Sequence, residues 1–307
     1  MYSKAYEKAR TFMYRNARPL DLARFQYHFE NGSKESVMEV LAYYQNEDGG
    51  FGHAVEPDSW NPNSTPLHCN TAGDIIRELD YEDARHPLIQ GLLKYYGSGR
   101  DFDGSHWALT VRSNNDYPHA PWWYLDSDSA CHTDYNGTAQ IAGFIVRYAE
   151  PGSELYKLGI RIVNEAVEAL MSVELADMHT CACYVHMLEH VNKAGAAGQV
   201  PYEMLKEKLH KAVKNLIVTD KSQWGDYICT PSQFMTSRDS EFYAENKEMA
   251  EYECEYIADT QLEDGSWEIP WSWGEFPDAW ALSKNWWKGR VIIEKLLYLK
   301  GFSTTNG

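Results

Sequence analysis

The chain has 307 residues, 44% of them hydrophobic and 24% charged, a balance typical of a globular protein with a sizeable core. Its formal net charge of −17, without a dense Lys/Arg cluster, argues against nucleic-acid binding. No apolar run reaches about 18 residues, so no membrane insertion is expected. The N-terminal segment lacks the apolar core of a signal peptide and the six cysteines lack a disulfide-like framework, so we expect a cytoplasmic protein.

Helical periodicity dominates the chain. The N-terminal segment 1–21 is typical of a charged helix, and apolar residues then repeat at helical spacing over 33–44, 87–96, 156–171, 202–217 and 287–299. Strand-like alternation is scarce. Gly- and Pro-rich stretches fall between the helices and not between two halves of the chain. These patterns predict an all-α protein with a single domain over 1–307.

A loop motif occurs twice, near opposite ends of the chain. The first copy is Gln45-Asn-Glu-Asp-Gly-Gly-Phe51 and the second is Gln261-Leu-Glu-Asp-Gly-Ser-Trp267. Glycine ends a helix because it tolerates left-handed backbone angles, and the Gln and Asp side chains can bond exposed backbone ends. We therefore expect both glutamines to bond backbone at helix ends and both aromatic rings to be buried.

Three predicted helices carry a stripe of polar residues on an otherwise apolar cylinder. The stripes are Asn70, Asp74 and Arg77; Asn136, Gln140, Gly143 and Arg147; and His179, Cys183, His186 and His190. Such stripes are expected where inner helices face a wet central cavity, and solvent-facing stripes are the alternative. Because Asn70, Asn136 and His179 stand near the starts of their helices, we expect them at one common rim.

These segments resemble the terpenoid cyclase and protein prenyltransferase superfamily. The second loop is similar to the QW repeat of squalene–hopene-type cyclases, and the first to the Gly-Gly-Phe-Gly loops of prenyltransferase β subunits. The segment Asp177-Met-His179-Thr-Cys-Ala-Cys183-Tyr resembles a helix start of those β subunits in which the His ligates zinc. The resemblance implies an α/α toroid of paired inner and outer helices.

Neither catalytic set of that superfamily is complete in this chain. The Asp-x-Asp-Asp acid motif of the cyclases has its nearest match in Asp126-Ser-Asp128-Ser, which lacks the last Asp. The prenyltransferase zinc site needs an Asp-x-Cys pair on a preceding helix, and Asp128-Ser-Ala-Cys131 is off by one residue. We therefore expect no cofactor and no tightly bound metal.

Acids and aromatic rings gather in three loops. The loop His53-Ala-Val-Glu56-Pro-Asp58-Ser-Trp60 holds groups for acid–base work and stacking, and a loop that only shapes the turn is the alternative. The irregular segment 101–133 has the character of a binding loop, or of a surface flap whose Trp residues pack beneath it. We expect proton transfer by Glu56, Asp58, Asp126 and Asp128, and ligand contact by His53, Trp60, Asn70, Trp122, Trp123, Asn136, His179, Trp271 and Trp273.

Three functions fit an acidic, aromatic pocket for a small organic ligand. The resemblance implies an isoprenoid-type cyclase or transferase, which a dry aromatic cavity would favour. A glycan-acting hydrolase or lyase is the second, because (α/α) barrels host such enzymes and two carboxylates carry their chemistry. A non-catalytic binding protein is the third. The oligomeric state is left open.

Overall fold

The computed structural model describes residues 1–127 and 134–303, and in this part the chain is helical without a β-strand. Extended pairing is limited there to isolated bridges such as that between Ser59 and His119. The all-α prediction is therefore confirmed. No helix in these ranges is long and apolar enough to cross a membrane.

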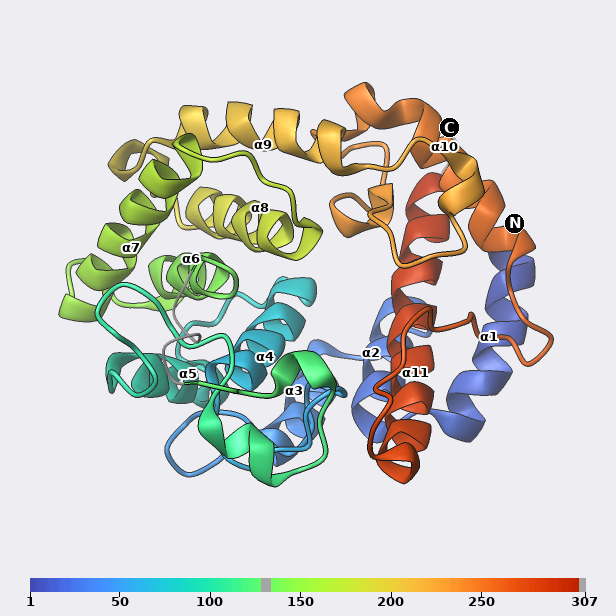
Figure 1. Cartoon of the computed structure of the whole chain (residues 1–307), viewed down its shortest axis with the longest axis horizontal. Helices are drawn as coiled ribbons and strands as arrows, with labels where there is room; N and C mark the ends of the chain where they lie inside the picture. The colour runs from blue at the N-terminus through green and yellow to red at the C-terminus, as the bar shows by residue number, and fades with distance from the viewer. Residues whose placement is uncertain (128–133, 304–307) are drawn as a thin grey trace. The chain divides into compact units, whose positions relative to one another are not determined.

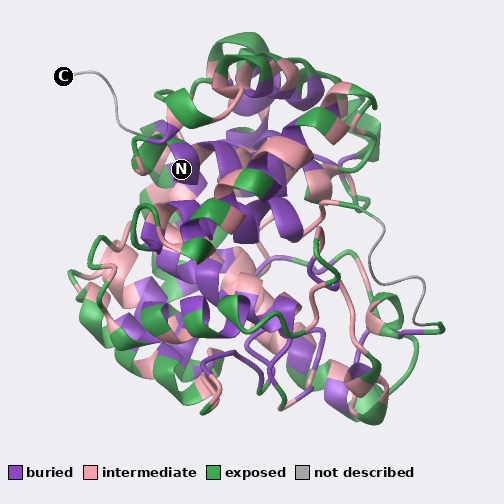
Figure 2. Ribbon diagram, turned by 90° about the vertical axis from the view of Figure 1, so that its left-hand side faces the viewer, coloured by how far each residue is buried: buried purple, intermediate pink, exposed green. Residues whose placement is uncertain are grey.

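The chain divides into two compact units. The first combines residues 1–40 with 213–307, so it is built from both ends of the chain, and the second spans 41–212. Within each unit the buried residues follow one side of most helices, which is the pattern that helical periodicity predicts (Figure 2). The single domain over 1–307 stays a prediction.

The long C-terminal helix organises the first unit. The helices of this unit are α1 (Tyr2–Asn16), α2 (Pro19–Phe29), α3 (Lys34–Leu41), α10 (Tyr243–Asp259) and α11 (Pro277–Ser303) (Figure 1). Helix α11 packs against α1, α2 and α10. Segment 1–21 forms two helices and not the single one expected. The break falls at Arg18, because a residue before proline is driven to extended backbone.

Helix α6 lies at the centre of the second unit. The helices here are α4 (Pro66–Glu78), α5 (Pro87–Gly97), α6 (Thr138–Tyr148), α7 (Glu154–Met171), α8 (Met178–Lys193) and most of α9 (Tyr202–Leu216). Helix α6 contacts α4, α5, α7 and α8 and is buried almost throughout. Gly143 lets α6 and α8 approach closely, because a Cβ there would lie 2.8 Å from the Cα atom of Met187.

The periodic segments are confirmed as helices, with shifted ends. Segment 33–44 ends its α-helix at Leu41 and continues as a 3₁₀ turn over Ala42–Tyr44. The segment predicted over 287–299 belongs to a longer helix, which begins at Pro277. Proline suits the first helical turn, since its missing N–H would have no partner there.

The two motif loops form the same hydrogen-bond network, one loop in each unit. In each, the glutamine Nε2 donates to the carbonyl of the loop glycine and to a carbonyl near the start of another helix. The acceptors are Gly49 (2.9 Å) and Leu88 (3.1 Å) for Gln45, and Gly265 (3.0 Å) and Ala5 (2.9 Å) for Gln261. The prediction for both glutamines is confirmed.

The aromatic residues of the motif loops are buried, as expected. Phe51 is fully buried and Trp267 is 2% exposed. The Trp267 indole N–H also donates to the Ile257 carbonyl at 2.9 Å, which ties the ring to the end of α10. Each ring therefore covers its turn from inside its own unit.

Helix α5 contacts the first motif loop in the same way as α1 contacts the second. Gly49 and Gly265 have φ values of +91° and +92°, and a Cβ on either would lie 2.3 Å from a helix carbonyl oxygen. That oxygen belongs to Gly91 in α5 and to Lys8 in α1, each three residues after the carbonyl that the loop glutamine bonds. The C-terminal loop is thus completed by a helix from the N-terminus.

Candidate functional site

Polar side chains of α4, α6 and α8 meet in the second unit. The imidazole Nδ1 of His186 lies 2.8 Å from Gln140 Oε1 and 3.4 Å from Asp74 Oδ1. Arg77 donates to Asp74 Oδ1 and to Glu189 Oε2, both at 2.9 Å. Apart from Glu189, these side chains belong to the three predicted stripes, so the stripes meet at this point. Glu189 was missed, although it stands three residues after His186 on the same helix face.

The charged groups in this cluster stabilise one another. Burial opposes the charged form of Arg77, but the Asp74 and Glu189 carboxylates raise the pKa of Arg77 above its ordinary value. The four ionisable side chains are between 17% and 36% exposed, so each keeps partial contact with solvent. An imidazole held beside a carboxylate suits proton transfer or hydrogen bonding to hydroxyl groups.

The predicted loop after the first motif approaches the same helices. Thr71, one turn before Asp74 on α4, donates from its hydroxyl to Glu56 Oε2 at 3.2 Å. Glu56 is 7% and Asp58 is 3% exposed. The Glu56 carboxylate therefore lies against α4, one turn before Asp74.

This loop also pairs with the irregular segment that carries the exposed rings. The backbone N–H of Ala120 donates to the Asp58 carbonyl at 2.8 Å, and that of Trp60 donates to the Pro118 carbonyl at 2.9 Å. Trp122 follows directly and is 46% exposed. The structure thus brings together backbone from two of the three loops that sequence reasoning singled out.

Sequence reasoning missed His68, which anchors this loop. His68 is fully buried on α4, with Nδ1 2.7 Å from Thr65 Oγ1 and Nε2 2.9 Å from the Ser59 carbonyl oxygen. Burial lowers the pKa of His68 to about 4, so the ring is neutral near pH 7. A lone histidine at the start of an apolar helix has no periodic signal. The Thr65-Pro-x-His68 capping pattern is the only local hint.

The remaining predicted residues of the second unit differ in their exposure. His53 is exposed and its ring lies 2.9 Å from the Asn46 side-chain oxygen. Asp126 and His179 are exposed, whereas Trp60, Asn70 and Trp123 are half-buried. Asp128 lies outside the described residues. Their roles in proton transfer and ligand contact stay predictions.

Trp271 and Trp273 belong to the first unit, where they pack with other rings. Trp273 is 2% exposed and lies 5.6 Å from Trp280 between ring centroids. Trp271 meets Trp287 and Tyr227 edge to face, at 5.1 and 5.4 Å. Their contact with a ligand also stays a prediction.

In the segment that resembles a zinc-ligating helix start, Cys183 is a buried thiol that keeps its proton near pH 7. Cys183 accepts from the Gly137 backbone N–H at 3.3 Å and lies 3.6 Å from the Asn136 side-chain oxygen. Burial raises the pKa of Cys183 to about 12. Within the described ranges no group of three His, Cys, Asp or Glu side chains is arranged to hold a metal ion. Cys131 and His132 lie outside those ranges.

We expect the purified chain to contain no tightly bound zinc, because a zinc site needs three or four convergent ligands and no group of three His, Cys, Asp or Glu side chains converges within the described ranges. Elemental analysis after dialysis against buffer tests this, with a zinc-loaded and dialysed sample as the control. One zinc per chain that disappears on His179→Ala would contradict the prediction.

Comparison of the chain with family models, with curated proteins and with solved structures gives no match.

Proposed function

We propose that the chain is an α/α toroid of the cyclase and prenyltransferase type. The duplicated loop supports this, because both copies use the same glutamine and glycine contacts to hold a neighbouring helix. The contact between Gln261 and Ala5 supports it further. In a closed ring of repeats the last loop must be completed by the first helix, as α1 completes the second loop.

We further propose that this toroid acts by acid–base chemistry on a carbohydrate. The observation that carries this choice is the cluster of Asp74, Gln140 and His186 with the Arg77–Glu189 pair. A hydrocarbon ligand would remove these groups from water without replacing their hydrogen bonds, at a cost of a few kcal/mol for each group. Sugar hydroxyl groups can replace them.

Glu56 is the side chain we assign to proton transfer. Its carboxylate accepts a hydrogen bond from Thr71, which is one turn before Asp74 of the cluster. Asp58 stands two residues away on the same loop. Glycoside hydrolysis needs two such carboxylates. Trp122 and Tyr124, 46% and 53% exposed, offer faces on which a sugar ring can stack. A cytoplasmic location is part of this proposal, in keeping with the absence of disulfides among the described cysteines.

The test compares neutral oligosaccharides, uronate oligosaccharides and geranylgeranyl diphosphate as ligands. We expect binding of an oligosaccharide, with release of reducing ends or of unsaturated sugar products. Glu56→Gln should lower turnover by about 10²-fold or more while leaving the thermal midpoint near that of the parent chain.

Glu174→Gln is the matched control, because Glu174 is an exposed acid of the same unit. Binding of the prenyl diphosphate without binding of any oligosaccharide would overturn the carbohydrate assignment in favour of an isoprenoid ligand. Oligosaccharide binding without turnover in the parent chain would identify a binding protein.

A further inference from the structure

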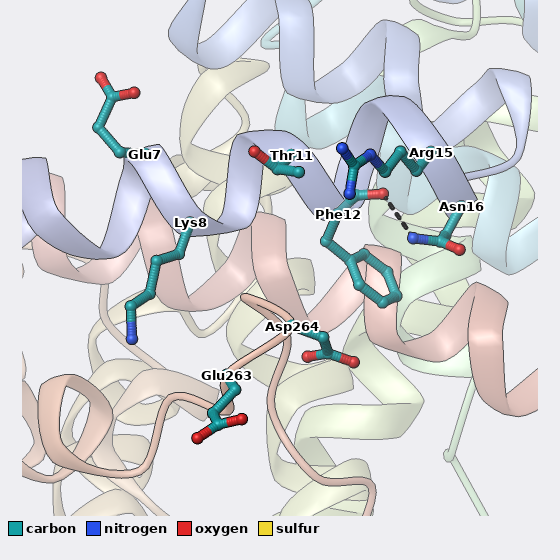
Figure 3. Close-up of a pocket in the computed structure, with 8 residues that line it drawn as sticks. All are labelled: Glu7, Lys8, Thr11, Phe12, Arg15, Asn16, Glu263 and Asp264. Atoms are coloured by element: carbon teal, nitrogen blue, oxygen red, sulfur yellow. Dashed lines mark hydrogen bonds between the residues drawn. The ribbon is translucent and has the colours of Figure 1, made fainter.

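A second candidate site lies in the first unit, where α1 meets the C-terminal motif loop. Figure 3 shows a pocket with α1 on one wall and the loop on the other. Its volume of about 420 Å³ falls within the range of about 300–1,000 Å³ found for small-molecule sites. The lining residues include Lys8, Thr11, Phe12, Arg15, Glu263 and Asp264.

The duplicated loop shows what fills the same place in the second unit. There Lys94, three residues after Gly91 on α5, donates from its ammonium group to the Glu47 carbonyl at 3.2 Å. Arg100 pairs with the Asp48 carboxylate at 2.9 Å. The first loop therefore has its outer carbonyl and carboxylate covered by cations of its own unit.

The C-terminal loop has the same acceptors but lacks the matching lysine. Since Lys8 corresponds to Gly91, the residue that corresponds to Lys94 is Thr11. Thr11 and Glu263 both line the pocket, which therefore lies where the corresponding lysine would extend. Within the described ranges, Lys288 of α11 approaches Asp264 Oδ2 at 3.3 Å, and no side chain donates to the Glu263 carbonyl.

We propose that this pocket binds an alkylammonium group that takes the place of the missing lysine, as carried by free lysine or by a lysine residue of a peptide. The ammonium group donates to the Glu263 carbonyl and the Asp264 carboxylate. The methylene chain packs beside Phe12, which lines the pocket, is 4% exposed and has the Lys288 ammonium 5.8 Å from its ring centroid (Figure 3). The net charge of −17 attracts cations to the chain as a whole.

The cations that line the pocket restrict the class of ligand that it can bind. Lys8 and Arg15 stand two turns apart on α1, on either side of Thr11. They disfavour a polyamine and can bond a carboxylate or carbonyl oxygen of the ligand. The preferred ligand therefore carries an acceptor group as well as an ammonium group, as an amino acid does.

Isothermal titration calorimetry on the full chain at pH 7 tests this with L-lysine, a Gly-Gly-Lys peptide, cadaverine and Nε-acetyl-L-lysine. L-lysine or the peptide should bind, and the tighter of the two identifies the source of the ammonium group. Nε-acetyl-L-lysine, which has no side-chain charge, should bind about tenfold more weakly or worse. Absence of binding by both lysine compounds at ~10 mM would overturn the proposal.

Thr11→Lys supplies the missing ammonium group from the chain itself. It should abolish lysine binding and raise the thermal midpoint, because the new side chain fills the pocket as Lys94 does. Ser3→Lys makes the same charge change on an exposed position of α1 and should leave binding unchanged. Equal lysine binding by Thr11→Lys and the parent chain would contradict the proposal.

Arg15→Gln provides an independent variant on an exposed position. It should weaken the binding of L-lysine by about tenfold, because it removes a partner of the carboxylate, and should leave the binding of cadaverine no weaker than in the parent chain, because it removes a like charge. Weaker binding of both compounds to the same extent would show that Arg15 does not bond the ligand, and would overturn the amino-acid assignment.

Discussion

Replacing Trp267 with alanine is expected to lower the free energy of unfolding by about 3–5 kcal/mol. Trp267 is among the largest fully buried side chains, and its indole N–H bonds the Ile257 carbonyl at 2.9 Å. The substitution removes the ring from the turn and leaves the α10 carbonyl without that donor. Because the same loop also bonds the start of α1 through Gln261, the substitution should destabilise the packing of α1 as well as that of α10.

Urea denaturation of Trp267→Ala and the parent chain measures this loss. Trp122→Ala is the matched control, since Trp122 is 46% exposed, and it should cost less than about 1 kcal/mol. A loss for Trp267→Ala no larger than that of the control would mean that the ring does not stabilise the loop.

The stability of the second unit is expected to fall as the pH drops from 6.5 toward 4. His68 has a pKa of about 4 in the folded chain, against about 6.5 when unfolded, because its charged form is desolvated. Between these values the unfolded chain binds the proton and the folded chain does not, so acid favours unfolding. The full loss is about 3 kcal/mol, reached near pH 4 and constant below it.

The variant His68→Asn isolates this contribution from that of other titrating groups. It should be less stable than the parent chain at pH 7, because the hydrogen bonds to Thr65 and Ser59 are lost. The difference between the two chains should then shrink as the pH falls to 4. A difference that stays constant over this range would show that His68 is not held neutral by burial.

The sequence by itself determined the helices and the two motif loops. A helix needs only local periodicity, and a loop of the Gln-x-Glu-Asp-Gly type closes through contacts within five residues, such as those from Gln261 to Gly265. These patterns are readable because the bonds that they form are short in sequence. The break before Pro19 is equally local, and the proline rule should have located it.

The site depended on contacts between residues far apart in the chain. The polar stripe of α4 is visible in the sequence, but only the packing of α4, α6 and α8 sets Arg77 against Glu189, 112 residues later. The burial that lowers the pKa of His68 also arises from tertiary packing. No periodic pattern distinguishes such a histidine from one that faces solvent.

The partner of the C-terminal loop likewise depended on the tertiary structure. Gln261 bonds the carbonyl of Ala5, 256 residues away, and no local pattern names that partner. The tertiary structure places α1 at the second loop as it places α5 at the first. Thr11 then corresponds to Lys94, and this correspondence identifies the ammonium group that the pocket lacks. Spacing along the chain determines which face a residue occupies on its own helix, whereas packing determines what that face meets.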